Sequence, residues 1–382
     1  MNKGFVFFRA GRIPFVIENC RMELFTDDSL LKDFMKEHNF KSNYILQGLY
    51  FLDGIQGKRA TFLVERSKGS MCYLCCYIIN TFAEKAEYDT IGFQSSFLDD
   101  IFRYKYNYIN MIRDGINLAV EPQDVYKVPF SMDQKHYELS FRIGQNNHLG
   151  LLEDFDKKGE VLIRLKTDEI QECYDISIVL YRLAMFMTSH QKVPFKRIIL
   201  YKNGWKVGEF YSQFVSEEAD SGAYGFYYQF DVMKYVPKIL NNIALDSGSK
   251  ITHSIPLGHI GEFDSLFSPQ RFIQQVMAFE YLFDKLEHKK AQDSKFSLKK
   301  ELKYMFEKFP QLLSYPKLSS DEISEQIKEI RRRISHGYAY YYDFKNDSNT
   351  RYLIVLLDKL IRNMSLLWIG FSKQDISDFC VI

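Results

Sequence analysis

Arg331 and His336, which lie near the C-terminus with R-x4-H spacing, are the residues of this chain best suited to catalysis. They belong to the segment RRRISHG at residues 331–337. A guanidinium stays protonated and can hold a phosphate through two hydrogen bonds, and an imidazole can transfer a proton near neutral pH. Together these two groups could break a phosphodiester bond without a metal ion.

RNA is the substrate that this pair of groups fits. Attack by the ribose 2′-oxygen needs proton transfers and neutralisation of the charge that develops at phosphorus. The expected products are a 2′,3′-cyclic phosphate and a 5′-hydroxyl, and DNA could not react because it lacks the 2′-hydroxyl. The alternative is structural, because basic residues are common near helix C-termini, where they interact favourably with the helix dipole.

The motif is expected at the end of an amphipathic helix that begins after Ser319. Ser319 and Glu322 have the spacing of a capping box, and Gly337 stands where a C-terminal glycine cap would. The buried stripe is formed by Ile323, Ile327, Ile330 and Ile334. At about 100° per residue, Arg331 lies on the flank of this stripe and His336 lies further round. A surface partner is therefore needed to close a pocket, and a second copy of the helix is the simplest one.

The motif helix belongs to a region that reads as helical from about residue 256 to residue 382. Further helices are predicted from Ser268-Pro269 onward, over 297–309 and over 350–369. Short connections between them indicate an up-and-down helical bundle. Residues 246–249 form a polar, glycine-containing joint in front of it.

Residues 1–255 are predicted to be β-rich, with a sub-boundary near residue 150. Short apolar runs separated by turn signals indicate a β-sandwich or a curled sheet up to that point. A small α/β part follows, with a helix over 169–188 and a hairpin at Asn203-Gly204. The expected fold class is α+β: a β-rich N-terminal domain with a small α/β part, followed by an all-α bundle.

Composition excludes several classes of function. The net charge is only +1, so binding to nucleic acid would need a local basic patch. No apolar stretch approaches the length of a membrane span, and Arg9 interrupts the early apolar run, so the cytoplasm is the expected location. Cys72 and Cys75 have the spacing of a zinc knuckle without a second pair, so buried thiols are expected, and no metal or cofactor site.

The helical region resembles a HEPN domain (higher eukaryotes and prokaryotes nucleotide-binding), a bundle whose ribonucleases carry an R-x4–6-H motif. Two stretches are similar more narrowly to the ApeA-like HEPN proteins of bacterial antiphage defence. They are SPQRFIQQVMAFEY at 268–281, which is similar to the first HEPN helix of that family, and IKEIRRRISHGY at 327–338. The β-rich region in front of the bundle resembles the family in layout only.

The resemblance implies a metal-independent endoribonuclease that acts in abortive infection as a homodimer through its HEPN domain. It identifies Arg331 and His336 as the catalytic pair, RNA (tRNA included) as the substrate, and the N-terminal region as the sensor of an unknown phage-derived trigger. Two other functions are compatible with the sequence: a non-catalytic HEPN module that dimerises and binds RNA or nucleotide, or the toxin of a toxin–antitoxin pair.

Residues around the motif are candidates for accessory or RNA-binding roles: Glu280, Arg332, Ser335 and Tyr338. Glu280 is predicted to be buried and therefore to pair with a basic group such as Arg331, although an exposed helix edge is the alternative. Arg332 replaces the small polar residue usual in the family and could add a phosphate contact. Tyr338 begins a tyrosine-rich stretch that could stack on bases or simply pack.

A basic rim for phosphates is a further hypothesis, with solvated helix faces as the alternative. Its candidate members are Lys328, Arg332, Arg333, Arg351, Lys359 and Arg362.

Overall fold

The structure is a computed structural model of the 382-residue chain. It describes residues 2–25, 29–39, 41–52, 56–81, 87–95, 97–98, 123–143, 159–188, 193–216, 235–245, 267–293, 295–313, 319–338, 341–368 and 370–379. The chain divides into two compact units, Met1–Tyr181 with Val193–Tyr224 and Arg182–Lys192 with Gly225–Ile382. The α+β class is confirmed, with a β-rich region followed by a helical one. The predicted boundaries near 150 and 255 and the joint at 246–249 lie outside the described residues.

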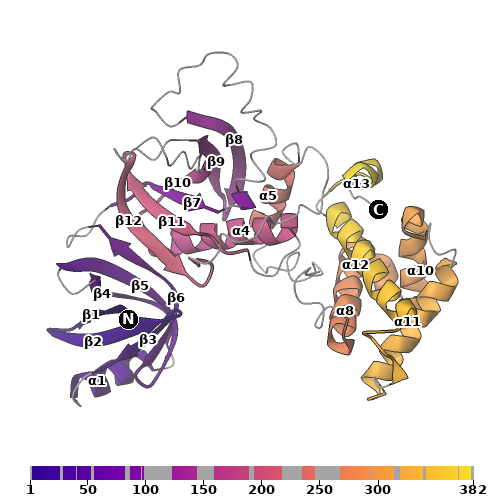
Figure 1. Cartoon of the computed structure of the whole chain (residues 1–382), viewed down its shortest axis with the longest axis horizontal. Coiled ribbons are helices and arrows are strands. Elements are labelled where there is room, and N and C mark those ends of the chain that lie inside the picture. The colour runs from indigo at the N-terminus through magenta and orange to yellow at the C-terminus, as the bar shows by residue number, and fades with distance from the viewer. Residues whose placement is uncertain are drawn as a thin grey trace. The chain divides into compact units, whose positions relative to one another are not determined.

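Six antiparallel strands at the N-terminus close into a barrel. They are β1 (Asn2–Phe8), β2 (Gly11–Glu18), β3 (Arg21–Leu24), β4 (Ser42–Leu52), β5 (Gln56–Lys68) and β6 (Met71–Asn80). Their order is β3-β2-β1-β4-β5-β6, and a pairing of β3 with β6 closes the circle (Figure 1). Glycines let the backbones of β1 and β4 approach: a Cβ on Gly4 would lie 2.0 Å from the oxygen of Leu49. The predicted sandwich or curled sheet is thus a closed barrel.

The barrel is filled by the inward side chains of its strands and is covered by α1 (Ser29–His38). Val6, Phe15 and Phe62 are fully or almost fully buried, as expected for the inner face of a small barrel. His38 stacks on Phe34 with ring centroids 4.4 Å apart. Burial lowers the pKa of His38, so this imidazole is a neutral member of the core.

The sheet continues beyond the barrel through β12, which pairs with β6. The further strands are β7 (Thr90–Gln94), β8 (Gln123–Met132), β9 (Lys135–Ile143), β10 (Gly159–Arg164), β11 (Arg197–Lys202) and β12 (Trp205–Ser212). The predicted hairpin is confirmed, with positive φ angles at Asn203 and Gly204 between β11 and β12. The predicted helix is α4 (Ile170–Thr188), and its Glu172 accepts hydrogen bonds from the backbone N–H groups of Lys166 and Thr167.

The second unit is helical. Its described elements are α5 (Val236–Leu245), α8 (Pro269–Leu286), α9 (His288–Ala291), α10 (Leu298–Lys308), a 3-10 turn (Pro310–Leu313), α11 (Ser320–Ser335), α12 (Ser348–Trp368) and α13 (Lys373–Phe379). The four predicted helices correspond to α8, α10, α11 and α12, whereas α5, α9 and α13 were not predicted. Ser268 caps α8 as expected, accepting a hydrogen bond from the backbone N–H of Arg271.

Candidate functional site

The backbone of the R-x4-H motif is fixed at both ends of α11. Ser319 and Glu322 form the predicted capping box at the N-terminus. At the C-terminus Gly337 has a φ of +82°, the N–H of Tyr338 donates to the oxygen of Arg333 at 2.8 Å, and the N–H of Gly337 donates to Ile334 at 3.0 Å. This is a Schellman motif, in which His336 is the C-cap residue. The position of the histidine backbone is therefore set by the helix end itself.

The side chains of the motif lie beside the core and not in it. Ile323, Ile327 and Ile330 are buried, and Ile334 is only partly so. Arg331, Ser335 and His336 are exposed. Because a step of five residues turns an α-helix through about 500°, Arg331 and His336 project in different directions from one copy of α11.

Arg331 pairs with Glu280 of α8. Its Nη2 lies 3.8 Å from Oε1 of Glu280, and the two side chains are 45% and 39% exposed. The predicted pairing is confirmed, but the prediction that Glu280 is buried is wrong, because Glu280 lies at the edge of the apolar face of α8. The neighbouring Met277 is 62% exposed.

The two arginines that follow share one carboxylate of their own helix, that of Glu329. Arg332 Nε and Nη2 donate to the carboxylate of Glu329 at 2.9 and 2.8 Å, and Arg333 Nε donates to it at 2.7 Å. These hydrogen bonds lower the pKa of Glu329 to about 2. Among the three motif arginines, Arg331 is thus the one that donates no hydrogen bond to a carboxylate in the described part of the chain.

Glu301 of α10 is a site residue that sequence reasoning missed. It is partly buried, and burial together with the neighbouring charge of Glu280 raises its pKa to about 7. The alignment of α8 with α10 is fixed nearby, where Lys308 Nζ donates to Glu287 at 2.9 Å. In the sequence Glu301 stands among lysines and reads as an ordinary surface charge, so no local signal marks it.

Tyrosine rings lie next to the motif. Tyr338 and Tyr341 are 48% and 62% exposed, with ring centroids 6.1 Å apart. The guanidinium of Arg333 lies 5.6 Å from the ring of Tyr341. These rings are accessible to a ligand, as base stacking would require.

The prediction that Arg362 belongs to an exposed basic rim is wrong, because its side chain is only 4% exposed. Its Nη2 lies 3.3 Å from Asp358 Oδ2, and Arg271 Nη2 lies 3.0 Å from Oδ1 of the same carboxylate. Gln275 also donates to Asp358 at 2.9 Å. Arg362 therefore belongs to a buried structural cluster between α8 and α12. Lys328 is held by Glu325 at 3.0 Å.

The cysteines of β6 are part of the barrel wall. Cys72 is fully buried, as the sequence predicted, whereas Cys75 is only partly buried. Cys76 is also fully buried, and burial raises the pKa of the Cys72 thiol to about 11. Within the residues that the structure describes, no group of His, Cys, Asp or Glu side chains is arranged to hold a metal ion.

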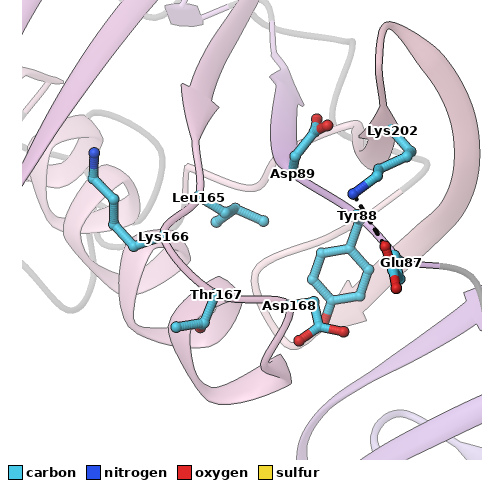
Figure 2. A pocket seen from close by; sticks show the side chains of 8 residues that line it. All are labelled: Glu87, Tyr88, Asp89, Leu165, Lys166, Thr167, Asp168 and Lys202. Carbon is cyan, nitrogen blue, oxygen red and sulfur yellow. Dashed lines mark ion pairs between the residues drawn. The ribbon is translucent and has the colours of Figure 1, made fainter.

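A polar pocket of about 400 Å³ lies in the β-rich unit (Figure 2). Its lining residues are Glu87, Tyr88, Asp89, Leu165, Lys166, Thr167, Asp168 and Lys202. Lys202 pairs with Glu87 at 3.2 Å, and the carboxylate of Asp89 accepts the N–H of Asn203 at 3.1 Å. These contacts join the segments around the pocket, so Glu87, Asp89 and Lys202 already have structural roles.

Comparison with known proteins finds no matching family model, no matching curated protein and no matching solved structure. Among the helices of the described residues, none has the length and apolar character needed to cross a bilayer.

Proposed function

We propose that this protein is a metal-independent endoribonuclease of the HEPN type whose catalytic residues are Arg331 and His336. The observation that carries the proposal is the contrast between neighbouring arginines of α11. Arg332 and Arg333 both donate hydrogen bonds to Glu329 at 2.7–2.9 Å, whereas the carboxylate of Glu280 lies 3.8 Å from Arg331, too far for a hydrogen bond. A phosphate can therefore compete for Arg331 at the smallest electrostatic cost.

The reaction is an internal transfer at phosphorus. The ribose 2′-hydroxyl loses its proton to an imidazole, and its oxygen attacks the adjacent phosphorus. The bond from phosphorus to the 5′-oxygen breaks, and that oxygen takes up a proton, leaving a 2′,3′-cyclic phosphate and a 5′-hydroxyl. Arg331 stabilises the charge on the non-bridging phosphate oxygens as the transition state forms. His336 is the group that moves the protons, because it is exposed and lies at the same helix end.

Two copies of α11 complete the site in this proposal. Since Arg331 and His336 diverge on one helix, a homodimer through the helical region would bring the arginine of one protomer to the histidine of its partner. Exposed Met277 on α8 supplies an apolar contact on the same side as Glu280, one helical turn before it. Ser335 and Tyr338 lie beside the motif and would contact the RNA backbone or a base.

The cellular role follows from the resemblance of residues 268–281 and 327–338 to the ApeA-like HEPN proteins. In this proposal the enzyme acts in the cytoplasm of a bacterium and cuts RNA, tRNA included, when a phage-derived trigger acts on the β-rich unit. Cleavage of host RNA would then stop phage propagation by abortive infection.

The test is cleavage of total bacterial RNA in excess EDTA by the wild-type protein and by His336→Ala. His288→Ala is the matched control, because His288 is also exposed in the helical unit and is held by Asp284 at 2.9 Å. We expect EDTA-resistant cutting by wild type and control, with cyclic-phosphate ends, and none by His336→Ala. Equal cutting by His336→Ala would contradict the proposal. A toxin activity that survives His336→Ala in cells would favour a non-catalytic binding module.

A further inference from the structure

The outer face of the barrel carries aromatic rings that the barrel core does not use. Phe5 and Phe7 of β1 point outward between the buried Val6 and Phe8, and both are partly exposed. Phe51 of β4 lies beside them, with its ring centroid 5.7 Å from that of Phe5. Since the barrel interior is filled by the inward side chains, these rings are not part of the barrel core.

The register of the strands makes these rings one continuous surface. Phe5 faces Leu49 across the β1–β4 pair, and Phe7 faces Arg12 across the β1–β2 pair. Leu49 in turn faces Arg59 of β5. We call this surface the outer barrel face and define it by its members: Lys3, Phe5, Phe7, Arg12, Leu49, Phe51 and Arg59.

The arginines of the outer barrel face are stacked on a ring. The guanidinium carbons of Arg59 and Arg12 lie 5.0 and 5.9 Å from the ring centroid of Phe7. Arg59 also donates to the side-chain oxygen of Gln47. In the described part of the chain, no carboxylate forms an ion pair with Arg12, Arg59 or Lys3.

Arg9, a neighbouring arginine, differs from those of the outer barrel face because it forms ion pairs with carboxylates. It also stacks on a ring, that of Phe8, but it pairs with Asp33 at 2.7 Å and Glu37 at 3.5 Å. Among the described residues, carboxylates therefore pair with Arg9 but not with the basic groups of the outer barrel face. Aromatic rings interleaved with arginines match a ligand that has both flat rings and negative charges.

We propose that the outer barrel face binds single-stranded RNA, with bases stacked on Phe5 and Phe51. Its phosphates are held by Lys3 and by Arg12 and Arg59, the two arginines that stack on Phe7. Duplex RNA fits less well, because its bases are stacked inside the helix and offer no free faces to the rings. A second copy of the same face fits less well because its arginines would repel those of the first. This site is separate from the cleavage motif, and it does not depend on the protein being a nuclease.

The test uses the Arg331→Ala/His336→Ala protein, in which the helical motif can neither cut RNA nor hold it through Arg331. Binding of a fluorescein-labelled oligouridylate is measured by anisotropy at several salt concentrations. Phe51→Ala and Arg59→Ala are each expected to weaken binding about tenfold, in line with the usual loss of one stacked base or one phosphate contact. Arg59→Ala should also reduce the salt dependence by about 0.7 in the log–log slope.

Arg9→Ala and Arg66→Ala are the matched controls. Arg66 also stacks on a ring, that of Tyr73 at 4.8 Å, but it lies outside the outer barrel face. Both controls should bind like the parent protein. Phe51→Leu covers the case in which Phe51→Ala fails to fold, because leucine keeps an apolar side chain on the strand but cannot stack on a base.

Three results would overturn the proposal: no binding at low salt by the parent protein, equal binding by all variants, or equal affinity for duplex and single strand. A dimer in sedimentation that Arg59→Ala dissociates would show a protein interface instead and would also overturn it. The nuclease proposal is tested separately, because wild-type cleavage and its loss in His336→Ala do not involve the barrel variants.

Discussion

Glu280 and Arg331 face each other from α8 and α11, with 3.8 Å between a carboxylate oxygen and a guanidinium nitrogen. This distance is longer than that of a charge-assisted hydrogen bond, about 2.7–2.9 Å, so the carboxylate orients the arginine without saturating its donors. Glu280 therefore restrains the orientation of the Arg331 guanidinium by charge attraction, and Arg331 keeps donors available for a phosphate.

Glu280→Ala is expected to lower RNA cleavage about tenfold, mainly through kcat. Without the Glu280 carboxylate the guanidinium of Arg331 would sample more orientations, and small losses of positioning reduce catalytic rates strongly. Single-turnover cleavage against RNA concentration separates kcat from KM. Asp284→Ala is the control, because Asp284 lies one turn further along α8 and pairs with His288 instead. If Glu280→Ala cuts RNA as fast as wild type, Glu280 has no role in positioning Arg331.

Glu301→Gln is expected to stabilise the protein above neutral pH. Burial and the charge of Glu280 raise the pKa of Glu301 to about 7 in the folded state, whereas an unfolded glutamate titrates near its ordinary value of 4.5. Between these values the folded state holds more protons than the unfolded state, so this group makes stability fall as pH rises from 4.5 to about 7. Glutamine does not ionise, so the Glu301→Gln variant lacks this loss of stability with rising pH.

Urea unfolding at pH 5 and pH 8 measures the effect. The free energy of unfolding of Glu301→Gln should exceed that of wild type by about 1 kcal/mol at pH 8. This is less than the full pKa shift corresponds to, because Glu301 is only partly buried and solvent screens its charge. The gap should shrink towards zero as pH falls towards 4.5. Glu307→Gln, an exposed carboxylate on the same helix, should show no such dependence. A gap that is constant with pH would rule out a raised pKa at Glu301.

Local sequence signals predicted the motif helix well and its surroundings poorly. The capping box at Ser319 and the glycine cap at Gly337 are interactions between near neighbours, so the sequence displays them directly. Barrel closure depends on β3 meeting β6, and the role of Glu301 depends on α8 lying beside α10. Neither relationship leaves a periodic pattern, because both are set by tertiary packing.

The burial of Arg362 is another result of tertiary packing that the sequence did not predict. Its position in a basic, amphipathic helix indicated an exposed side chain, but the structure buries it against Asp358. A charge can be buried where a partner from another helix, here Arg271 on α8, shares the same carboxylate. Only the packed arrangement of α8 and α12 reveals this cluster.

Asp358→Ala is expected to destabilise the helical unit by about 3–5 kcal/mol, because it leaves two buried arginines without their common counter-charge. Urea unfolding monitored by far-UV circular dichroism measures the loss. Asp347→Ala is the comparison: Asp347 accepts the N–H of Thr350 at 2.8 Å in the first turn of α12, and losing such a cap costs about 1 kcal/mol. Equal effects of the two changes would mean that the buried cluster contributes no more than a helix cap.

Arg331→Lys and Arg332→Lys should separate the motif arginine from its neighbour. A lysine keeps the charge but cannot grip a phosphate through two parallel hydrogen bonds, so Arg331→Lys should reduce cleavage about a hundredfold. Arg332→Lys should cut within about twofold of wild type, because Glu329 already occupies the guanidinium of Arg332. Cleavage rates at saturating RNA, with thermal melting as a check on folding, measure both. If Arg332→Lys is the more damaging change, then its pair with Glu329 opens when RNA binds, and Arg332 is the residue that holds the phosphate.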